Sequence, residues 1–119
     1  MKNAKELVNI ACKALDEHKG QDITVLDIRD VTVIADYFII VSGDNDRQVT
    51  ALQDAVEEAL GRAGYTPRAI EGARTTSWIL LDYGDVIVHV FNKEDRLFYD
   101  LERIWRDGKR ISLEDLNVD

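Results

Sequence analysis

Asp44 and Asp46 are the residues whose type and spacing come closest to catalytic chemistry. Paired carboxylates can hold Mg²⁺ for nucleotidyl transfer, and in such transferases they lie on a strand beside a glycine–serine turn. Here the pair follows a predicted strand and opens a predicted helix, and Gly43 follows a serine instead of preceding one. Acidic side chains at this position are typical of helix capping, because they offset the positive end of the helix dipole. Capping is the favoured interpretation, and no catalytic residue is predicted.

The two histidines and the single cysteine offer little further chemistry. His18 ends a predicted helix, where a cation is favourable, and His89 lies on a predicted strand among apolar neighbours. Neither has a second His or a Cys at metal-ligand spacing, and no serine or cysteine has a visible base. Cys12 lies on a helical apolar stripe and is interpreted as a small core residue. The sequence therefore predicts no metal site, no disulfide and no cofactor.

Residues 77–91 are the most informative segment, because they predict two strands joined by a tight turn at Gly84. If Tyr83–Gly84 is the loop, Asp82 pairs with Asp85, and the next matching pairs are Leu80 with Ile87 and Trp78 with His89. Side chains alternate across a strand, so the hairpin has two unlike faces. The first is purely aliphatic and is predicted to lie in the core; it carries Ile79, Leu81, Val86, Val88 and Val90.

The other side of the hairpin, called the mixed face below, is apolar in the middle and acidic at one end. It comprises Trp78, Leu80, Asp82, Asp85, Ile87 and His89. Trp78 supplies the largest apolar area and one N–H donor. It is interpreted either as buried core or as an interface anchor, and the polar residues beside it favour the anchor. The mixed face is therefore the predicted site for another protein.

The elements that position this hairpin follow from hydrophobic periodicity. Helices are predicted at 3–18, from a cap at Asp44 or Asn45 to 63, and at 96–106; further strands are predicted at 22–28, 37–42 and 66–71. This order gives an α/β fold with a single mixed five-stranded sheet and helices packed mainly on one face. Several strands are apolar on both sides, so the uncovered face is expected to need a partner or a self-contact.

Charge and length narrow the classes of function. The 119 residues form one predicted domain, with 15 basic and 23 acidic side chains and a net charge of -8. Such acidity disfavours direct binding to nucleic acid and favours a basic protein partner. A basic cluster at Arg103, Arg106, Lys109 and Arg110 is interspersed with acids and is interpreted as a solvated helix end. No apolar run reaches the roughly 20 residues that span a bilayer, and a cytoplasmic location is expected.

Several motifs resemble those of the ribosomal silencing factor family, which is related to iojap. The likeness covers residues 3–106, within a predicted domain at 1–107 followed by a polar tail at 108–119. Its most specific parts are the Asp-Tyr-Gly-Asp-Val-Ile-Val-His-Val stretch that begins at Asp82 and the Phe-Tyr-Asp-Leu-Glu-Arg-Ile-Trp stretch that begins at Phe98. The resemblance implies a nucleotidyltransferase-like fold without the catalytic carboxylates.

The resemblance also implies a function. A member of this family would bind the large ribosomal subunit through its fourteenth-numbered protein, block joining of the small subunit, repress translation when nutrients are scarce, and form homodimers. The partner-binding residues carried over are Trp78, Leu80, Asp82, Tyr83, Asp85 and His89. Two alternatives stay open: a nucleotidyltransferase-like enzyme acting on a small substrate, and a dimeric assembly module with no ribosomal role.

Overall fold

The computed structural model describes residues 4–30, 32–72, 78–94 and 109–111. Residues 109–111 are described by their backbone alone. The helices in these ranges are α1 (Ala4–Glu17) and α2 (Asp46–Arg62). The strands are β1 (Gln21–Asp27), β2 (Tyr37–Gly43), β3 (Ala69–Glu71), β4 (Trp78–Asp82), β5 (Val86–Asn92) and β6 (Lys109–Ile111). The predicted helix at 96–106 lies outside the described residues, with Arg103 and Arg106 of the basic cluster. Lys109 and Arg110 of that cluster lie in β6, so they belong to a strand and not to the end of a helix.

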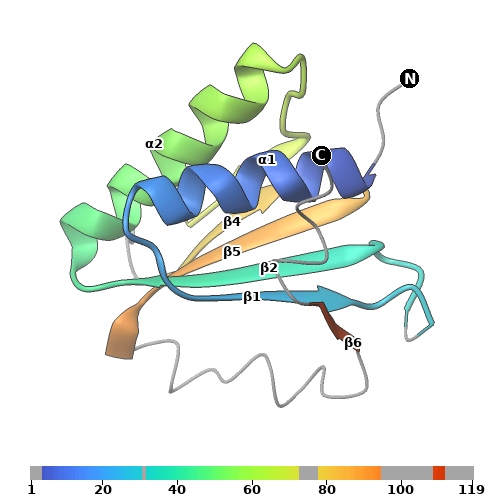
Figure 1. Cartoon of the computed structure of the whole chain (residues 1–119), viewed down its shortest axis with the longest axis horizontal. Coiled ribbons are helices and arrows are strands. Elements are labelled where there is room, and N and C mark those ends of the chain that lie inside the picture. Colours follow the sequence, from blue (N-terminus) through green and yellow to red (C-terminus); the bar gives the residue numbers. More distant parts are fainter. Residues whose placement is uncertain (1–3, 31, 73–77, 95–108, 112–119) are drawn as a thin grey trace.

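The strands form one mixed sheet in the order β3-β4-β5-β2-β1-β6. Strands β2 and β5 run parallel at the centre, and every other neighbouring pair is antiparallel. Figure 1 shows α1 and α2 side by side over the same face of this sheet. The predicted mixed sheet with helices on one face is therefore confirmed. Its sixth strand, β6, was not predicted, because it lies in the segment interpreted as a polar tail.

The two helices are held on the sheet by their apolar stripes. In α1 the residues at helical spacing, among them Leu7, Ala11 and Leu15, are buried, as the periodicity predicts. Cys12 belongs to the same stripe and is 6% exposed, which confirms its interpretation as a core residue. Burial also raises the pKa of the Cys12 thiol to about 12, so little reactive thiolate forms near neutral pH.

The sequence predicts that either Asp44 or Asn45 caps the start of helix α2, and the structure decides between them. Asn45 is the N-cap, and its side-chain oxygen accepts a hydrogen bond from the Gln48 amide at 2.9 Å. A capping box between Asn45 and Gln48, in which the Gln48 side chain would also bond to the Asn45 amide, is only half formed. The Gln48 side chain instead donates to the His18 carbonyl at 2.7 Å and so ties the end of α1 to the start of α2.

The register of the β4–β5 hairpin differs from the predicted one by two residues. Trp78 pairs with Phe91 and Leu80 pairs with His89, so the two-residue loop is Gly84–Asp85 instead of Tyr83–Gly84. Gly84 has a φ of +89°, in the left-handed region that glycine adopts without strain. The predicted pairing of Trp78 with His89 and of Leu80 with Ile87 is wrong. A slip of two residues preserves the alternation, so both faces keep their predicted side chains.

The aliphatic face of the hairpin lies beneath the helices, as predicted. All five of its side chains, Ile79, Leu81, Val86, Val88 and Val90, are 0% exposed. They belong to one cluster with the buried residues of α1 and α2. Burial of this kind contributes about 1.5–3 kcal/mol per large aliphatic side chain, which makes this cluster the main core of the domain.

A second, smaller cluster lies on the face of the sheet that the helices leave open. Its buried members are Leu26, Ile28, Ala35, Phe38, Ile40, Ile87 and Phe91, and Trp78 and Leu80 pack against it with partial exposure. The expectation that this face needs a partner or a self-contact stays a prediction. Most of the cluster is already buried, and the apolar surface of the hairpin that remains accessible is concentrated at Trp78 and Leu80.

Candidate protein-binding surface

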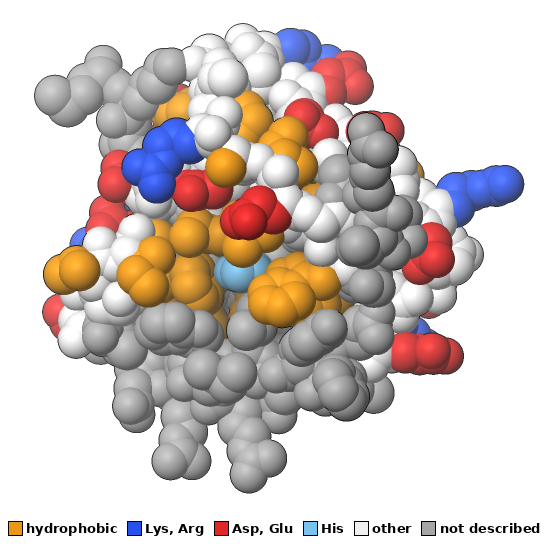
Figure 2. Space-filling view, turned by 180° about the vertical axis from the view of Figure 1, so that it is seen from behind, with side chains coloured by type: hydrophobic (Ala, Val, Ile, Leu, Met, Phe, Trp, Pro, Cys, Tyr) orange, Lys and Arg blue, Asp and Glu red, His pale blue; other side chains and the backbone are white. Residues whose placement is uncertain are grey.

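The mixed face lies on the side of the sheet away from α1 and α2. Figure 2 shows hydrophobic side chains gathered on this side around one histidine, which lies in a hollow between them, with acidic side chains along one margin. The described residues of the mixed face come from β4, β5 and the turn between them. One hairpin therefore positions all the side chains that the surface would use.

Trp78 is held by aromatic neighbours on this face. Its ring stacks on that of Phe91, with centroids 5.1 Å apart and planes 27° from parallel. Its indole Nε1–H donates a hydrogen bond to Nδ1 of His89 at 3.2 Å. Phe91 is fully buried, whereas Trp78 keeps partial exposure. Trp78 therefore has a supported inner side and an accessible outer part, which is the arrangement expected of an interface anchor.

Gly72 fixes where the backbone of Trp78 lies. The glycine has a φ of +81°, and a Cβ added there would meet the Trp78 carbonyl oxygen at 2.0 Å. No other residue type fits both this conformation and this close approach. Trp78 is therefore located by a backbone contact at the end of the edge strand β3 as well as by its ring contacts.

His89 is buried inside the aromatic group. It is 4% exposed, and its ring makes an edge contact with Phe38 at a centroid distance of 4.8 Å. Burial lowers the pKa of His89 from its ordinary value of 6.5 to about 4, because the apolar surroundings disfavour the charged imidazole. The side chain is therefore neutral at physiological pH. Its partners make it a structural neighbour of Trp78 more than an exposed contact residue.

Lowering the pH from about 7 to about 5 should reduce the free energy of unfolding by about 2 kcal/mol through His89. The folded-state pKa lies below the unfolded-state value, so the unfolded chain binds the proton first. This stability is fully present above pH 6.5 and is lost as the pH falls toward 4. Urea unfolding at several pH values measures it. His89→Leu should flatten the dependence; equal slopes in wild type and His89→Leu would contradict the prediction.

The acidic end of the mixed face is partly neutralised. Asp82 accepts a hydrogen bond from the Gly84 amide at 2.8 Å and pairs with the Arg68 guanidinium at 3.2 Å. Asp85 lies in the turn with its side chain exposed, and its carbonyl accepts from the amides of Asp36 and Tyr37. An exposed pair such as Arg68–Asp82 stabilises little, so the Arg68 side chain can be displaced by a partner. Asp85 is the accessible charge at this end.

Tyr83 lies on the other side of the hairpin. Its ring packs against the core cluster beneath the helices, and its hydroxyl is buried with no hydrogen-bond partner among the described residues. Burial, with a smaller contribution from Glu57, raises the pKa of Tyr83 to about 12. The structure thus brings Trp78, Leu80 and His89 together on the mixed face and separates Tyr83 from them.

Two apolar side chains near the turn were not singled out from the sequence. Val33 and Ile34, in the loop between β1 and β2, are 102% and 60% exposed. The loop is internally bonded, with Ile34 donating its amide to Thr32 Oγ1 at 3.2 Å, and it meets the Asp85 turn through Asp36. The sequence does contain a signal for them, because two adjacent β-branched apolar residues stand between Asp30 and Asp36. These exposed side chains therefore belong to a loop whose backbone contacts the turn of the hairpin.

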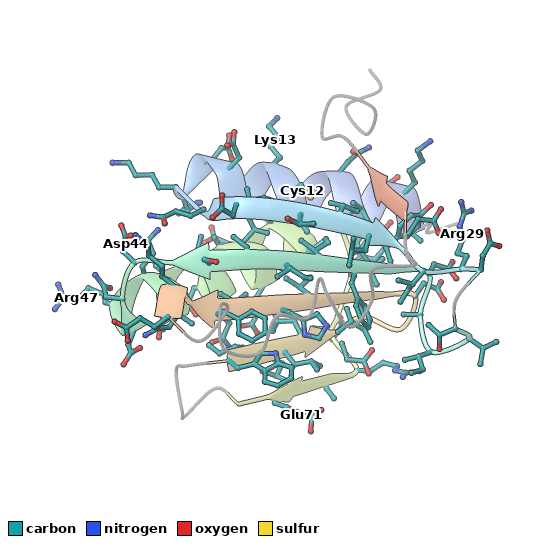
Figure 3. The ribbon with its side chains drawn as sticks, turned by 90° about the horizontal axis from the view of Figure 1, so that it is seen from below. Cys12, Lys13, Arg29, Asp44, Arg47 and Glu71 are labelled. Atoms are coloured by element: carbon teal, nitrogen blue, oxygen red, sulfur yellow. The ribbon has the colours of Figure 1, made fainter. Side chains whose placement is uncertain are left out.

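The carboxylates at the start of α2, Asp44 and Asp46, accept hydrogen bonds from residues that do not belong to the mixed face. Asp44 accepts from Gln21 at 2.6 Å, and Asp46 accepts from Asn92 at 3.1 Å. Figure 3 shows Asp44 and Arg47 at one end of the sheet and Arg29 at the opposite end. Among the described residues, no group of three or more His, Cys, Asp or Glu could hold a metal ion, and no helix is long and apolar enough to cross a membrane.

A shallow groove lies on the helical side, between α1 and α2. It has a volume of about 410 Å³ and is lined by Ile10, Lys13, Ala14, Glu17, Ala59, Arg62 and Ala63. Its alanines and alternating charges provide neither an anchor residue nor a charge of one sign. The groove therefore offers a weaker basis for recognition than the mixed face, and its residues serve as control positions.

The family resemblance is confirmed by comparison with known proteins. The model of a family described as "Ribosomal silencing factor during starvation" matches residues 1–119. A ribosomal silencing factor of Bacillus subtilis is 37% identical over 112 residues, which are 94% of this chain and 95% of that protein. The chloroplastic protein Iojap of maize is 34% identical over 101 residues, 85% of this chain and 44% of that longer protein.

A solved structure supports the same assignment. The crystal structure of a Chromobacterium violaceum protein superimposes with a TM-score of 0.85 at 37% identity and covers 93% of this chain and 92% of that one. Family model, sequence relatives and fold agree over nearly the whole length. The chain therefore belongs to the family of ribosomal silencing factors.

Proposed function

We propose that this protein represses translation by binding the large ribosomal subunit through its fourteenth-numbered ribosomal protein and sterically blocking the small subunit, for example when nutrients are scarce. The observation that supports this most is Trp78, a partly exposed ring supported by Phe91 and His89 beside an acidic turn. An aromatic anchor with a charged margin is typical of protein recognition.

Charge supports a basic partner. The chain has a net charge of -8, and the mixed face ends at the exposed Asp85. Phosphate backbones repel such a surface, whereas a basic ribosomal protein is attracted to it and associates faster at low salt. The contact would therefore be made with protein rather than directly with ribosomal RNA. The homodimer that the family resemblance implies and the cytoplasmic location expected from the sequence are part of the same proposal.

Joining of purified subunits tests the block directly. Light scattering rises when small and large subunits associate, and preincubating large subunits with the protein should reduce the amplitude in proportion to occupancy. Trp78→Ala should need a higher concentration for the same reduction, whereas Lys13→Ala, on the opposite side of the molecule, should act like wild type. Unchanged association at a saturating concentration of wild-type protein would overturn the block.

The alternative proposal, an enzyme acting on a small substrate, is separated from this one by Asp44 and Asp46. We expect the double variant Asp44→Asn/Asp46→Asn to bind large subunits as wild type does. At most about 1 kcal/mol of stability should be lost at the start of α2, because the cap Asn45 is unchanged and only the charge near the helix dipole is removed. Nucleotide transfer is measured by incubating the wild type and the double variant with labelled nucleotides and Mg²⁺. Nucleotide transfer by the wild type that disappears in the double variant would establish the enzyme instead.

A further inference from the structure

We propose that His89 is a positioning residue for recognition: by accepting the Trp78 indole N–H it fixes the orientation of that ring, so that the partner meets the apolar part of Trp78. The inference rests on the proposed function for its binding step, but the positioning itself is a property of the free protein. It changes the expected role of His89 from a contact residue to a support for one.

The geometry defines the support on two sides of the indole. Phe91 stacks on the ring at 5.1 Å and fixes its plane, but stacking alone permits a flip about the Cβ–Cγ bond that keeps this plane and reverses the direction of Nε1. The hydrogen bond from Nε1 to His89 Nδ1, at 3.2 Å, removes that freedom. The edge contact of His89 with Phe38 at 4.8 Å holds the acceptor itself in place. Together these contacts select one orientation of Trp78.

The bond also determines the tautomer of His89. Indole Nε1–H can only donate, so Nδ1 must carry the lone pair and the proton of the neutral imidazole must lie on Nε2. Nε2 is buried and has no hydrogen-bond partner among the described residues. Among the described residues, the bond to Trp78 is thus the side-chain hydrogen bond that this ring makes.

An apolar residue would fit this position at lower cost. Phe38, Ile40 and Phe91 lie beside His89 and are apolar and buried, and an unpaired N–H among them is unfavourable. A residue type that is unfavourable for packing is expected at a position that serves recognition. Because its donor is already used, the indole presents a ring surface to the partner, and the complementary pocket is expected to be apolar.

The free protein provides the first test. In Trp105→Phe, which leaves Trp78 as the single indole, long-range ¹H–¹⁵N spectra should show His89 unprotonated at Nδ1 and protonated at Nε2. The Trp78 indole N–H should exchange with water more slowly than in free tryptophan. His89→Leu should abolish the slow exchange, and His89→Gln, whose amide oxygen can accept, should restore much of it. The opposite tautomer, or unchanged exchange in His89→Leu, would overturn the positioning.

Binding to large subunits provides the second test. We expect His89→Leu to weaken binding by about fivefold to tenfold and His89→Gln to recover most of it, because one hydrogen bond is lost and regained. If His89→Leu binds like wild type, the role of His89 in recognition is overturned. If Trp78→Ala binds like wild type as well, the proposed binding surface fails independently, while the spectra of the free protein still decide the positioning. The tautomer measurement needs no variant of His89, so a His89 variant that fails to fold leaves it decisive.

Discussion

Replacing Trp78 with alanine should weaken binding to the large ribosomal subunit by at least tenfold, and by about thirtyfold if the ring is a typical anchor. The substitution removes the partly exposed ring that stacks on Phe91 and leaves a hollow beside His89. A titration of labelled protein against large subunits, followed by sedimentation, measures the change. Ile10→Ala, a matched apolar truncation in the groove between α1 and α2, should bind like wild type.

The same variant separates an anchor from a core residue. A fully buried aromatic cut to alanine costs about 3–5 kcal/mol, and Trp78, which is only partly buried, should cost less. We expect a folded protein with a modestly lower melting temperature, and binding is to be measured well below that temperature. Unfolding of Trp78→Ala at room temperature would show that Trp78 is a core residue. A folded variant with normal binding would place the contact elsewhere, for example at Tyr99 and Trp105.

Gly72→Ala should reduce the free energy of unfolding by roughly 3 kcal/mol or more, the largest effect on stability expected here. The new Cβ would lie 2.0 Å from the Trp78 carbonyl oxygen, and the φ of +81° disfavours any side chain. The backbone of Gly72 or Trp78 must move to make room for the Cβ, so the position of Trp78 changes too. The substitution should therefore weaken binding to large subunits as well as lower the free energy of unfolding. Urea unfolding and the sedimentation titration together measure both effects.

Gly61→Ala is the matched control for this glycine substitution. Gly61 lies in α2, and nothing stands within 4 Å of an added Cβ. Alanine is the better helix former, so the change should stabilise the protein by up to about 1 kcal/mol and leave binding unchanged. Stability of Gly72→Ala within about 0.5 kcal/mol of wild type would mean that the close approach to Trp78 is not required in solution.

The alternation of apolar residues predicted much of the fold because it records burial directly. The aliphatic side of the hairpin, represented by Ile79 and Val88, lies in the core as expected. The register did not follow from the same pattern, since a slip of two residues leaves every side chain on its predicted face. Turn geometry decides it, and here Tyr83 pairs with Val86 around Gly84–Asp85.

Elements that depend on distant contacts could not be read from local patterns. Strand β6 (Lys109–Ile111) is three residues long and forms by pairing with β1, far away in the sequence. Its residues show no periodicity of their own, so they were predicted as part of a polar tail. A short edge strand of this kind is defined by its neighbour, not by its propensity.

The candidate surface was predicted in composition but not in its internal contacts. Alternation places Trp78, Leu80 and His89 on one face, and the structure agrees. Burial of His89 and the ion pair of Asp82 with Arg68 depend on side chains from other segments of the chain, so local sequence patterns could not predict them. Tyr83 was carried over from the family resemblance and lies against the opposite cluster, where the same alternation would have placed it.

Sedimentation of the purified protein with separated ribosomal subunits tests the central claim most directly. The protein should pellet with large subunits at a stoichiometry that saturates, should stay in the supernatant with small subunits, and should bind large subunits more weakly when Trp78 is replaced by alanine. Equal pelleting with both subunits, or binding to protein-free ribosomal RNA alone, would contradict recognition of a large-subunit protein through the mixed face.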